Sequence, residues 1–275
     1  MKTIIVPVDF SAASINAANY ALSFAEVIKA SIALLHVYQF PIAFTESPVP
    51  AQVTGEMLED VEKQIHELKN ELLHKCGGRL KIYAEIKEGQ ITTQLQDYCK
   101  RLDPYAILMG ARGISTTERV LFGSNTLSAM KHLAYPLIIV PIGATFKKIE
   151  KVGLACDLHS ISETVHAVEI KRLVSDFQAK LHVLYINTVQ DKMIGDEEIE
   201  GSAWLREILM EVKPNFHFLR NPNIEEAIQE FTEKNNLDML IVIPKKHGLL
   251  EGIFHRSETK HIALHSHIPL LSIHE

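Results

Sequence analysis

The chain has 275 residues, of which 47% are hydrophobic and 23% charged, and its formal net charge is −6 with an isoelectric point near 6.2. This balance is typical of an ordinary globular protein, and the length suits two domains of about 100–150 residues each. A mildly acidic chain argues against a protein that binds the phosphate backbone of nucleic acids, because such proteins carry a basic patch.

Three cysteines, Cys76, Cys99 and Cys156, are scattered and form no Cys-x-x-Cys pair. This pattern argues against a disulfide framework and favours a reducing compartment. The first apolar run reaches Asp9 too soon for a signal peptide, and no later run approaches the roughly 20 apolar residues of a membrane span. We therefore expect a cytoplasmic protein with no membrane partner.

Taken in chain order, the first half alternates strands with helices. Ile4–Val8 predicts a buried parallel strand, and Ser11 is a candidate N-cap for a helix that extends to about Lys29. A strand is predicted at 31–38, followed by a loop at 39–55 that is rich in proline and glycine. After this loop we predict a helix at 56–75, a strand at 80–86, a helix at 90–101, a strand at 105–109, a helix at 124–134 and a strand at 137–141.

The same order then restarts after a short linker at 143–148. Residues 152–156 are followed by Asp157, as the first strand is followed by Asp9, and residues 181–185 resemble 34–38. The segments 238–244 and 266–273 match 103–110 and 134–140 in the same way. A repeat of this length indicates duplication. We predict an α/β fold with two tandem open parallel five-stranded sheets and helices on both faces, divided into domains 1–144 and 145–275.

A glycine-bearing segment after the predicted fourth strand is the most informative part of the chain. It contains Gly110, Gly113 and Gly123, separated by two and then nine residues, and it ends in Ser124 and Asn125 at the start of a helix. Glycines let a phosphate approach the backbone, and a helix N-terminus favours an anion. Neither a Walker P-loop nor a G-x-G-x-x-G fingerprint is present, so neither of those nucleotide sites is expected.

This spacing, together with Asp9 at the end of the first strand, resembles the ATP-binding type of universal stress protein, and the resemblance covers both halves. It implies the fold of that family, also described as adenine nucleotide alpha hydrolase-like, and ATP with Mg²⁺ as the ligand. Asp9 and the backbone near Pro7 and Val8 would then hold the adenine and ribose. By the same resemblance Val37 would pack on the adenine, Met109 and Gly110 would line the ribose, and the phosphates would be wrapped by Arg112, Gly113, Gly123, Ser124 and Asn125. Turn glycines and a helix-capping Asp are the structural alternative for any one of these residues.

The second half keeps Asp157 but not the glycine segment. Arg256 stands at the position of Gly123, and Ile243 or Pro244 stands at that of Gly110, so side chains would collide with a phosphate. We expect this half to serve as a structural or regulatory partner that pairs with the first half through the strands at 137–141 and 268–273. The sequence does not determine whether two such chains form a homodimer.

Enzymatic and metal-binding functions receive little support. His255, His261, His265 and His267 are close together, but no further ligand completes a zinc set, so no metal site is expected. No catalytic triad or pair of acids is evident, and no catalytic residue is assigned. The sequence favours an ATP-binding stress or regulatory protein, with a weak ATPase and a scaffold that binds no nucleotide as alternatives.

Overall fold

A computed structural model describes residues 1–39, 51–113, 120–121, 124–158, 166–188, 195–243 and 267–273. For residues 51–54, 112–113, 120–121 and 197 it describes the backbone alone. The elements of the first half are β1 (Thr3–Pro7), α1 (Ala12–Ile28), β2 (Ser31–Tyr38), α2 (Ala51–Lys75), β3 (Ile82–Glu88), α3 (Ile91–Leu102), β4 (Ala106–Gly110), β5 (Arg112–Gly113), β6 (Val120–Leu121), α4 (Ser124–His132) and β7 (Leu137–Val140). Those of the second half are β8 (Lys151–Ala155), α5 (Ala167–Phe177), β9 (Lys180–Asn187), α6 (Asp196–Ile208), a short 3₁₀ turn (Met210–Val212), β10 (Asn215–Arg220), α7 (Ile224–Asn235), β11 (Met239–Val242) and β12 (Leu270–Ser272).

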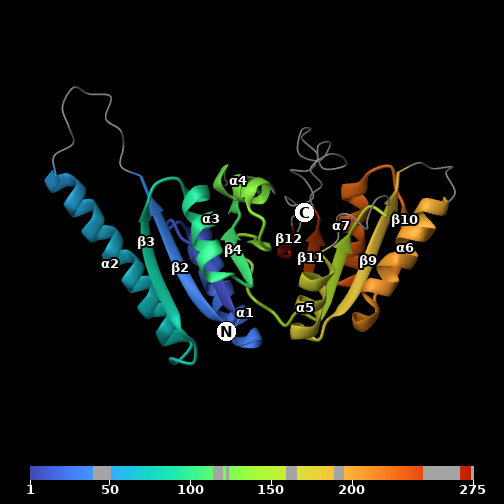
Figure 1. Ribbon diagram of the computed structural model, residues 1–275, viewed down its shortest axis with the longest axis horizontal. Coiled ribbons are helices and arrows are strands. Elements are labelled where there is room, and N and C mark those ends of the chain that lie inside the picture. The colour runs from blue at the N-terminus through green and yellow to red at the C-terminus, as the bar shows by residue number, and fades with distance from the viewer. Residues whose placement is uncertain are drawn as a thin grey trace, which may run out of the picture.

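Ten strands form one sheet, in the order β10-β9-β8-β11-β12-β7-β4-β1-β2-β3 (Figure 1). Each half contributes five strands that are parallel to one another, which agrees with the predicted α/β class. The two sets of strands are not separate sheets, because β12 and β7 lie side by side and antiparallel. The chain thus covers two similar α/β units that share one sheet.

The joint between the halves has the symmetry of a two-fold axis. Ile107 and Leu240 are equivalent, because they lie opposite Ile5 and Gly153, each of which is four residues before the aspartate that follows its strand. Ile107 also lies opposite Leu137 in β7, and Leu240 lies opposite Leu270 in β12. Leu137 is therefore equivalent to Leu270, and Ile138 to Leu271. Across the joint, Ile138 pairs with Leu271. Equivalent residues therefore face each other, as they do in the isologous interface of a two-fold dimer.

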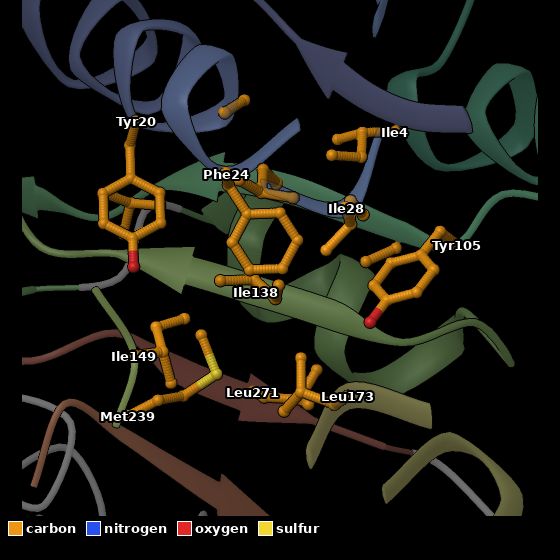
Figure 2. Close-up of a cluster of buried hydrophobic side chains, with 14 of the residues drawn as sticks. Ile4, Tyr20, Phe24, Ile28, Tyr105, Ile138, Ile149, Leu173, Met239 and Leu271 are labelled. Carbon is orange, nitrogen blue, oxygen red and sulfur yellow. The ribbon is translucent and has the colours of Figure 1, made fainter. Parts of the chain in front are cut away.

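Helices cover both faces of the sheet. Residues of α1, α2, α5 and α6 belong to one hydrophobic cluster, whereas residues of α3, α4 and α7 pack on the opposite face. The first cluster continues across both halves, and Figure 2 shows Phe24 and Ile138 of the first half beside Leu173, Met239 and Leu271 of the second. The sheet and this cluster together make the two halves one packed body.

The segment predicted as a linker takes part in that core. Phe146 packs edge-on against Tyr20, with 5.3 Å between ring centroids, and lies 6.1 Å from Phe24. Phe24 also contacts Phe177 of α5 at 4.8 Å. The segment 143–148 connects β7 to β8, as expected of a linker, and its Phe146 side chain is partly buried between the halves.

Several predicted element bounds need correction. The helix α2 begins at Ala51, so the last five residues of the predicted loop are helical, and residues 40–50 of that loop lie outside the described residues. The third strand is shifted by two residues toward the C-terminus. The strand bounds 31–38 and the N-cap at Ser11 are confirmed, because the Ser11 side chain accepts a hydrogen bond from the Ser14 N–H.

Candidate nucleotide cavity

A small cavity lies at the carboxyl edge of the first half, where β1, β2 and β4 end. It encloses about 90 Å³ and is lined by Pro7, Val8, Asp9, Ser11, Ala13, Ser14, Val37, Ile91, Met109, Gly110, Ser124, Asn125 and Thr126. The sheet order places β2 on one side of β1 and β4 on the other, so the chain changes direction between β1 and β4. In open α/β sheets the crevice at such a switch point is the usual ligand site.

Most of the predicted site residues come together in this cavity. Eight of the eleven line it, namely Pro7, Val8, Asp9, Val37, Met109, Gly110, Ser124 and Asn125. Arg112 and Gly113 lie just beyond, in β5, where the backbone pairs with β6. Gly123 lies outside the described residues.

Sequence reasoning missed five lining residues: Ser11, Ala13, Ser14, Ile91 and Thr126. Ser11 was recognised only as a cap. The signal that could have found them is positional, because each lies in or just before the first turn of a helix that follows a strand. Such first turns gather at the carboxyl edge of a parallel sheet.

Three helices begin at the cavity: α1, α3 and α4. Their first turns contribute Ala13, Ile91 and Ser124, respectively. A helix N-terminus presents unpaired backbone N–H groups and the positive end of the helix dipole. Among the described lining residues there is no lysine or arginine, so these helix ends are the main source of positive potential in that part of the site.

Asp9 is fixed by a network with the first turn of α1. Its Oδ1 accepts hydrogen bonds from the Ser11 N–H at 3.1 Å and from the Ser11 hydroxyl at 2.5 Å. The Asp9 N–H donates to the Ser14 Oγ at 3.3 Å, and the Ser14 hydroxyl donates to the Ser11 carbonyl at 3.1 Å. The helix-capping role weighed as the structural alternative is thus carried out by Ser11, and Asp9 holds Ser11 in place.

Gly110 is required by packing rather than by an unusual backbone angle. It is not among the glycines with positive φ, but a Cβ built on it would lie 2.2 Å from the Ala13 carbonyl oxygen. The start of α1 therefore passes directly over the end of β4. Thr126 adds a second tie, since its hydroxyl donates to the Gly110 carbonyl at 3.4 Å and joins the first turn of α4 to the same strand end.

The turn between β1 and α1 adopts a strained conformation. Phe10 has φ 59°, in the left-handed region, which an L-residue occupies at a cost of about 1–2 kcal/mol. Its ring stacks on His36 with 4.8 Å between centroids, and His36 Nδ1 lies 2.8 Å from the Val8 carbonyl oxygen. Since a carbonyl oxygen only accepts, Nδ1 carries the hydrogen and donates it.

Strand registers settle which residues of the second half correspond to the site. Gly153 and Ile5 are equivalent, because each lies four residues before its aspartate, and they face Leu240 and Ile107, respectively. Gly110 therefore corresponds to Ile243, not to Pro244. The predicted match of 34–38 with 181–185 was wrong by two residues: the Val8 N–H donates to Leu35 and the Cys156 N–H donates to Leu184, so Leu35 and Leu184 are equivalent.

The larger of the two cavities described, about 790 Å³, lies between residues 143–147 and α7. The equivalent face of α3 carries α4, through a Thr92–Ser128 hydrogen bond of 3.1 Å and a Gln96 amide that donates to the His132 carbonyl. The residues aligned with α4 in the second half, 257–265, lie outside the described residues. We therefore assign this cavity no function.

The part of the chain that the structure describes holds no group of three or more His, Cys, Asp or Glu side chains placed to bind a metal ion. His267 is described, whereas His255, His261 and His265 lie outside the described residues. None of the described helices combines the length and apolar character needed to cross a bilayer.

Comparison with known proteins agrees with this geometry. The model of the universal stress protein family matches residues 1–141, slightly more than half of the chain. The chain belongs to the universal stress protein family. A universal stress protein of Methanocaldococcus jannaschii is 24% identical over 140 residues, which make up 50% of this chain and 81% of that protein.

Solved structures share the architecture of the whole chain. A universal stress protein from Archaeoglobus fulgidus superposes with a TM-score of 0.75 at 18% identity, and the match covers 99% of this chain and 98% of that one. A putative universal stress protein from Pseudomonas aeruginosa gives a TM-score of 0.62 at 10% identity, covering 100% and 93% of the two chains. At these identities the likeness shows the fold, including its two α/β units.

Proposed function

We propose that this universal stress protein binds one adenine nucleotide per chain, ATP with Mg²⁺, at the cavity of the first half. In this proposal the protein acts in the cytoplasm and transmits the nucleotide state as a stress or regulatory signal. The division into domains 1–144 and 145–275 is part of the proposal, with the second half as the partner that binds no nucleotide.

The observation that carries the proposal is the meeting of three helix N-termini with the ends of β1, β2 and β4. An anionic phosphate chain suits helix N-termini, because their N–H groups donate to it and their dipoles favour negative charge. Ser124 and Asn125 are exposed at the first turn of α4, so they are accessible to phosphate oxygens. Arg112 follows Gly110 by two residues, and in the sequence it is the positively charged residue nearest to Gly110.

The opposite side of the cavity has a different character. Val8, Val37, Met109 and Ile91 supply apolar surface, which suits the flat face of a purine base. Asp9 is the acidic residue among the described lining residues, and a carboxylate accepts hydrogen bonds from ribose hydroxyls or from an exocyclic amine. The cavity is smaller than the roughly 300–1,000 Å³ of typical ligand sites. We therefore expect it to hold one moiety of the nucleotide, with the rest extending toward Arg112 and Ser124.

The described residues of the second half differ from those of this site in two ways. Ile243 stands at the position of Gly110, and a side chain there is incompatible with a helix that passes as close as α1 does. The described helix α5 begins ten residues after Asp157, whereas α1 begins three residues after Asp9. These differences support one site per chain.

Of the alternatives, slow ATP hydrolysis is compatible with the site, and our proposal includes no rapid turnover. Among the described lining residues there is no histidine, lysine or glutamate, and Asp9 accepts two hydrogen bonds from Ser11. Phosphoryl transfer to water is accelerated when a residue orients the attacking water and cations stabilise the developing charge. A scaffold without a ligand is the remaining alternative.

Titration calorimetry with Mg·ATP tests the proposal, using Asp9→Asn and its matched control Asp157→Asn. We expect one site per chain, a loss of affinity of about tenfold or more in Asp9→Asn because a charge-assisted hydrogen bond contributes about 1.5–3 kcal/mol, and parent affinity in Asp157→Asn. Mass spectrometry of any nucleotide that co-purifies gives an independent reading. Two equivalent sites, equal effects of the two substitutions, or no binding of ATP would each contradict the proposal.

A further inference from the structure

We infer that Phe10 and His36 are positioning residues that hold Asp9 at the cavity of the first half. We call this pair the turn clamp. The inference rests on the proposed nucleotide function for its consequence in binding, but its geometry is independent of any ligand. Neither residue was singled out by the sequence analysis, because Phe10 follows Asp9 in a turn and His36 lies within a predicted strand.

The turn clamp holds both neighbours of Asp9. On one side, His36 Nδ1–H donates to the Val8 carbonyl at 2.8 Å. On the other, the Phe10 ring stacks on the same imidazole at 4.8 Å with an angle of 22° between the planes. One side chain of β2 thus fixes the residue before Asp9 and the residue after it.

The opposite side of the turn is fixed by α1. The Asp9 N–H donates to the Ser14 Oγ, and the Asp9 carboxylate accepts from the Ser11 N–H. These bonds require a chain reversal at Phe10, which takes φ 59°. Because an aromatic residue disfavours this conformation, the stack on His36 is what we expect to keep the reversal in place. Without the clamp the turn is free to relax and Asp9 to leave the cavity.

The second half provides an internal comparison. The registers place Leu158 at the position of Phe10 and Tyr185 at that of His36. Leu158 is described and is not among the non-glycine residues with positive φ. The Tyr185 ring has no donor at the position that corresponds to Nδ1 of His36. Its only donor is the hydroxyl at the far end of the ring, which donates to Glu198 Oε1 at 3.3 Å. The turn clamp therefore occurs in the half that contains the candidate nucleotide cavity.

Two substitutions separate the parts of the clamp. His36→Phe keeps a ring that can stack on Phe10 but has no donor for the Val8 carbonyl, whereas His36→Asn keeps a side-chain N–H near the position of Nδ1 but loses the ring. Phe10→Leu introduces the residue found at 158 and serves as a further variant if His36→Phe does not fold. Tyr185→Phe is the matched control in the second half.

The test combines Mg·ATP affinity with a double-mutant cycle. We expect each clamp variant to weaken binding by about tenfold and Tyr185→Phe to leave it unchanged. In the Asp9→Asn background the clamp substitutions should weaken ATP binding by less than a further twofold, because they act through Asp9. If the clamp acted on the structure in general, the same substitutions would still weaken binding about tenfold in that background. Full additivity of the two losses, or parent affinity in the clamp variants, overturns the inference.

Hydrogen exchange of the Ser11 amide in ligand-free protein decides the inference even if the parent binds no ATP. That amide donates to Asp9, so release of the turn should raise its exchange rate about tenfold in His36→Phe or Phe10→Leu relative to the parent. An unchanged rate in both variants means that the clamp does not position Asp9. Failure of ATP binding in the parent, with faster exchange in the variants, refutes the nucleotide proposal alone.

Discussion

Gly110 offers a test of how closely α1 approaches the sheet. A Cβ at this position would lie 2.2 Å from the Ala13 carbonyl oxygen and 2.5 Å from its carbonyl carbon. Real Cβ atoms essentially never come closer than 3.0 Å to such an atom, so Gly110→Ala has to push the start of α1 away by about 1 Å. The obstructing atoms are backbone, which cannot rotate aside. Overpacking of this kind costs about 1–3 kcal/mol, and we expect the upper end of that range.

Two other glycines are matched controls for the added methyl group. At Gly153 a Cβ would meet Leu237 Cδ1 at 2.6 Å and Leu240 Cδ1 at 3.1 Å, and these are tips of flexible side chains that can turn away. We expect Gly153→Ala to lower the free energy of unfolding by about 1 kcal/mol. At Gly55, within α2, nothing lies within 4 Å, so Gly55→Ala should raise it by about 0.5–1 kcal/mol through helix propensity.

Urea unfolding followed by circular dichroism measures the three variants on one scale, and calorimetry with Mg·ATP measures their affinity. The expected order of stability is Gly55→Ala above the parent, then Gly153→Ala, then Gly110→Ala. Gly110→Ala should also lose ATP affinity, because a displaced α1 moves Asp9 and Ser11. If Gly110→Ala is as stable as Gly153→Ala, the close approach of α1 to β4 is not a feature of the folded protein.

Three further predictions concern catalysis, the joint and pH. ATP turnover should stay far below the median enzyme rate of about 10 s⁻¹, and a rate near that value in a phosphate-release assay would reveal a water-activating group. Leu271→Lys places a charge in the buried joint and should increase proteolysis at 143–148, whereas unchanged resistance would show that β7 and β12 do not hold the halves together. Burial lowers the pKa of both His182 and His217, which are hydrogen-bonded at 3.0 Å, and the unfolded chain therefore binds more protons below about pH 6.5. The free energy of unfolding should therefore fall as the pH drops below that value. The fall should be less steep in the double variant His182→Leu/His217→Phe than in the control variant His66→Gln. Equal slopes in the two variants would show that this histidine pair does not cause the pH dependence.

Local patterns predicted most of the elements of the first half. The capped helix α1 and the buried strand β2 follow from a serine before an apolar stripe and from a compact apolar run. The repeat register was less accessible, since a shift by two residues leaves the same side chains on the same face of a strand. The strand registers and the backbone hydrogen bonds to Leu35 and Leu184 distinguish the two alignments.

The candidate site was predictable to the extent that it depends on strand ends. Asp9, Val37 and Gly110 follow or end strands, and parallel strands bring their carboxyl ends to one edge. Ser14 and Ile91 were missed because helix first turns carry no distinctive residue type. Their role comes from the crossing of separate elements.

The amino-acid sequence by itself determined the alternation of strands and helices and the glycine spacing, because each depends on residues near one another in the chain, and it determined the repeat because the same local patterns recur in the same order. The tertiary structure alone decided that the halves share one sheet through Ile138 and Leu271, that the partly buried Phe146 packs between them, and that Phe10 and His36 contact the two neighbours of Asp9. These features depend on pairs of residues far apart in the chain. Such pairs meet only when apolar burial and strand pairing have chosen one arrangement, and no local pattern records that choice.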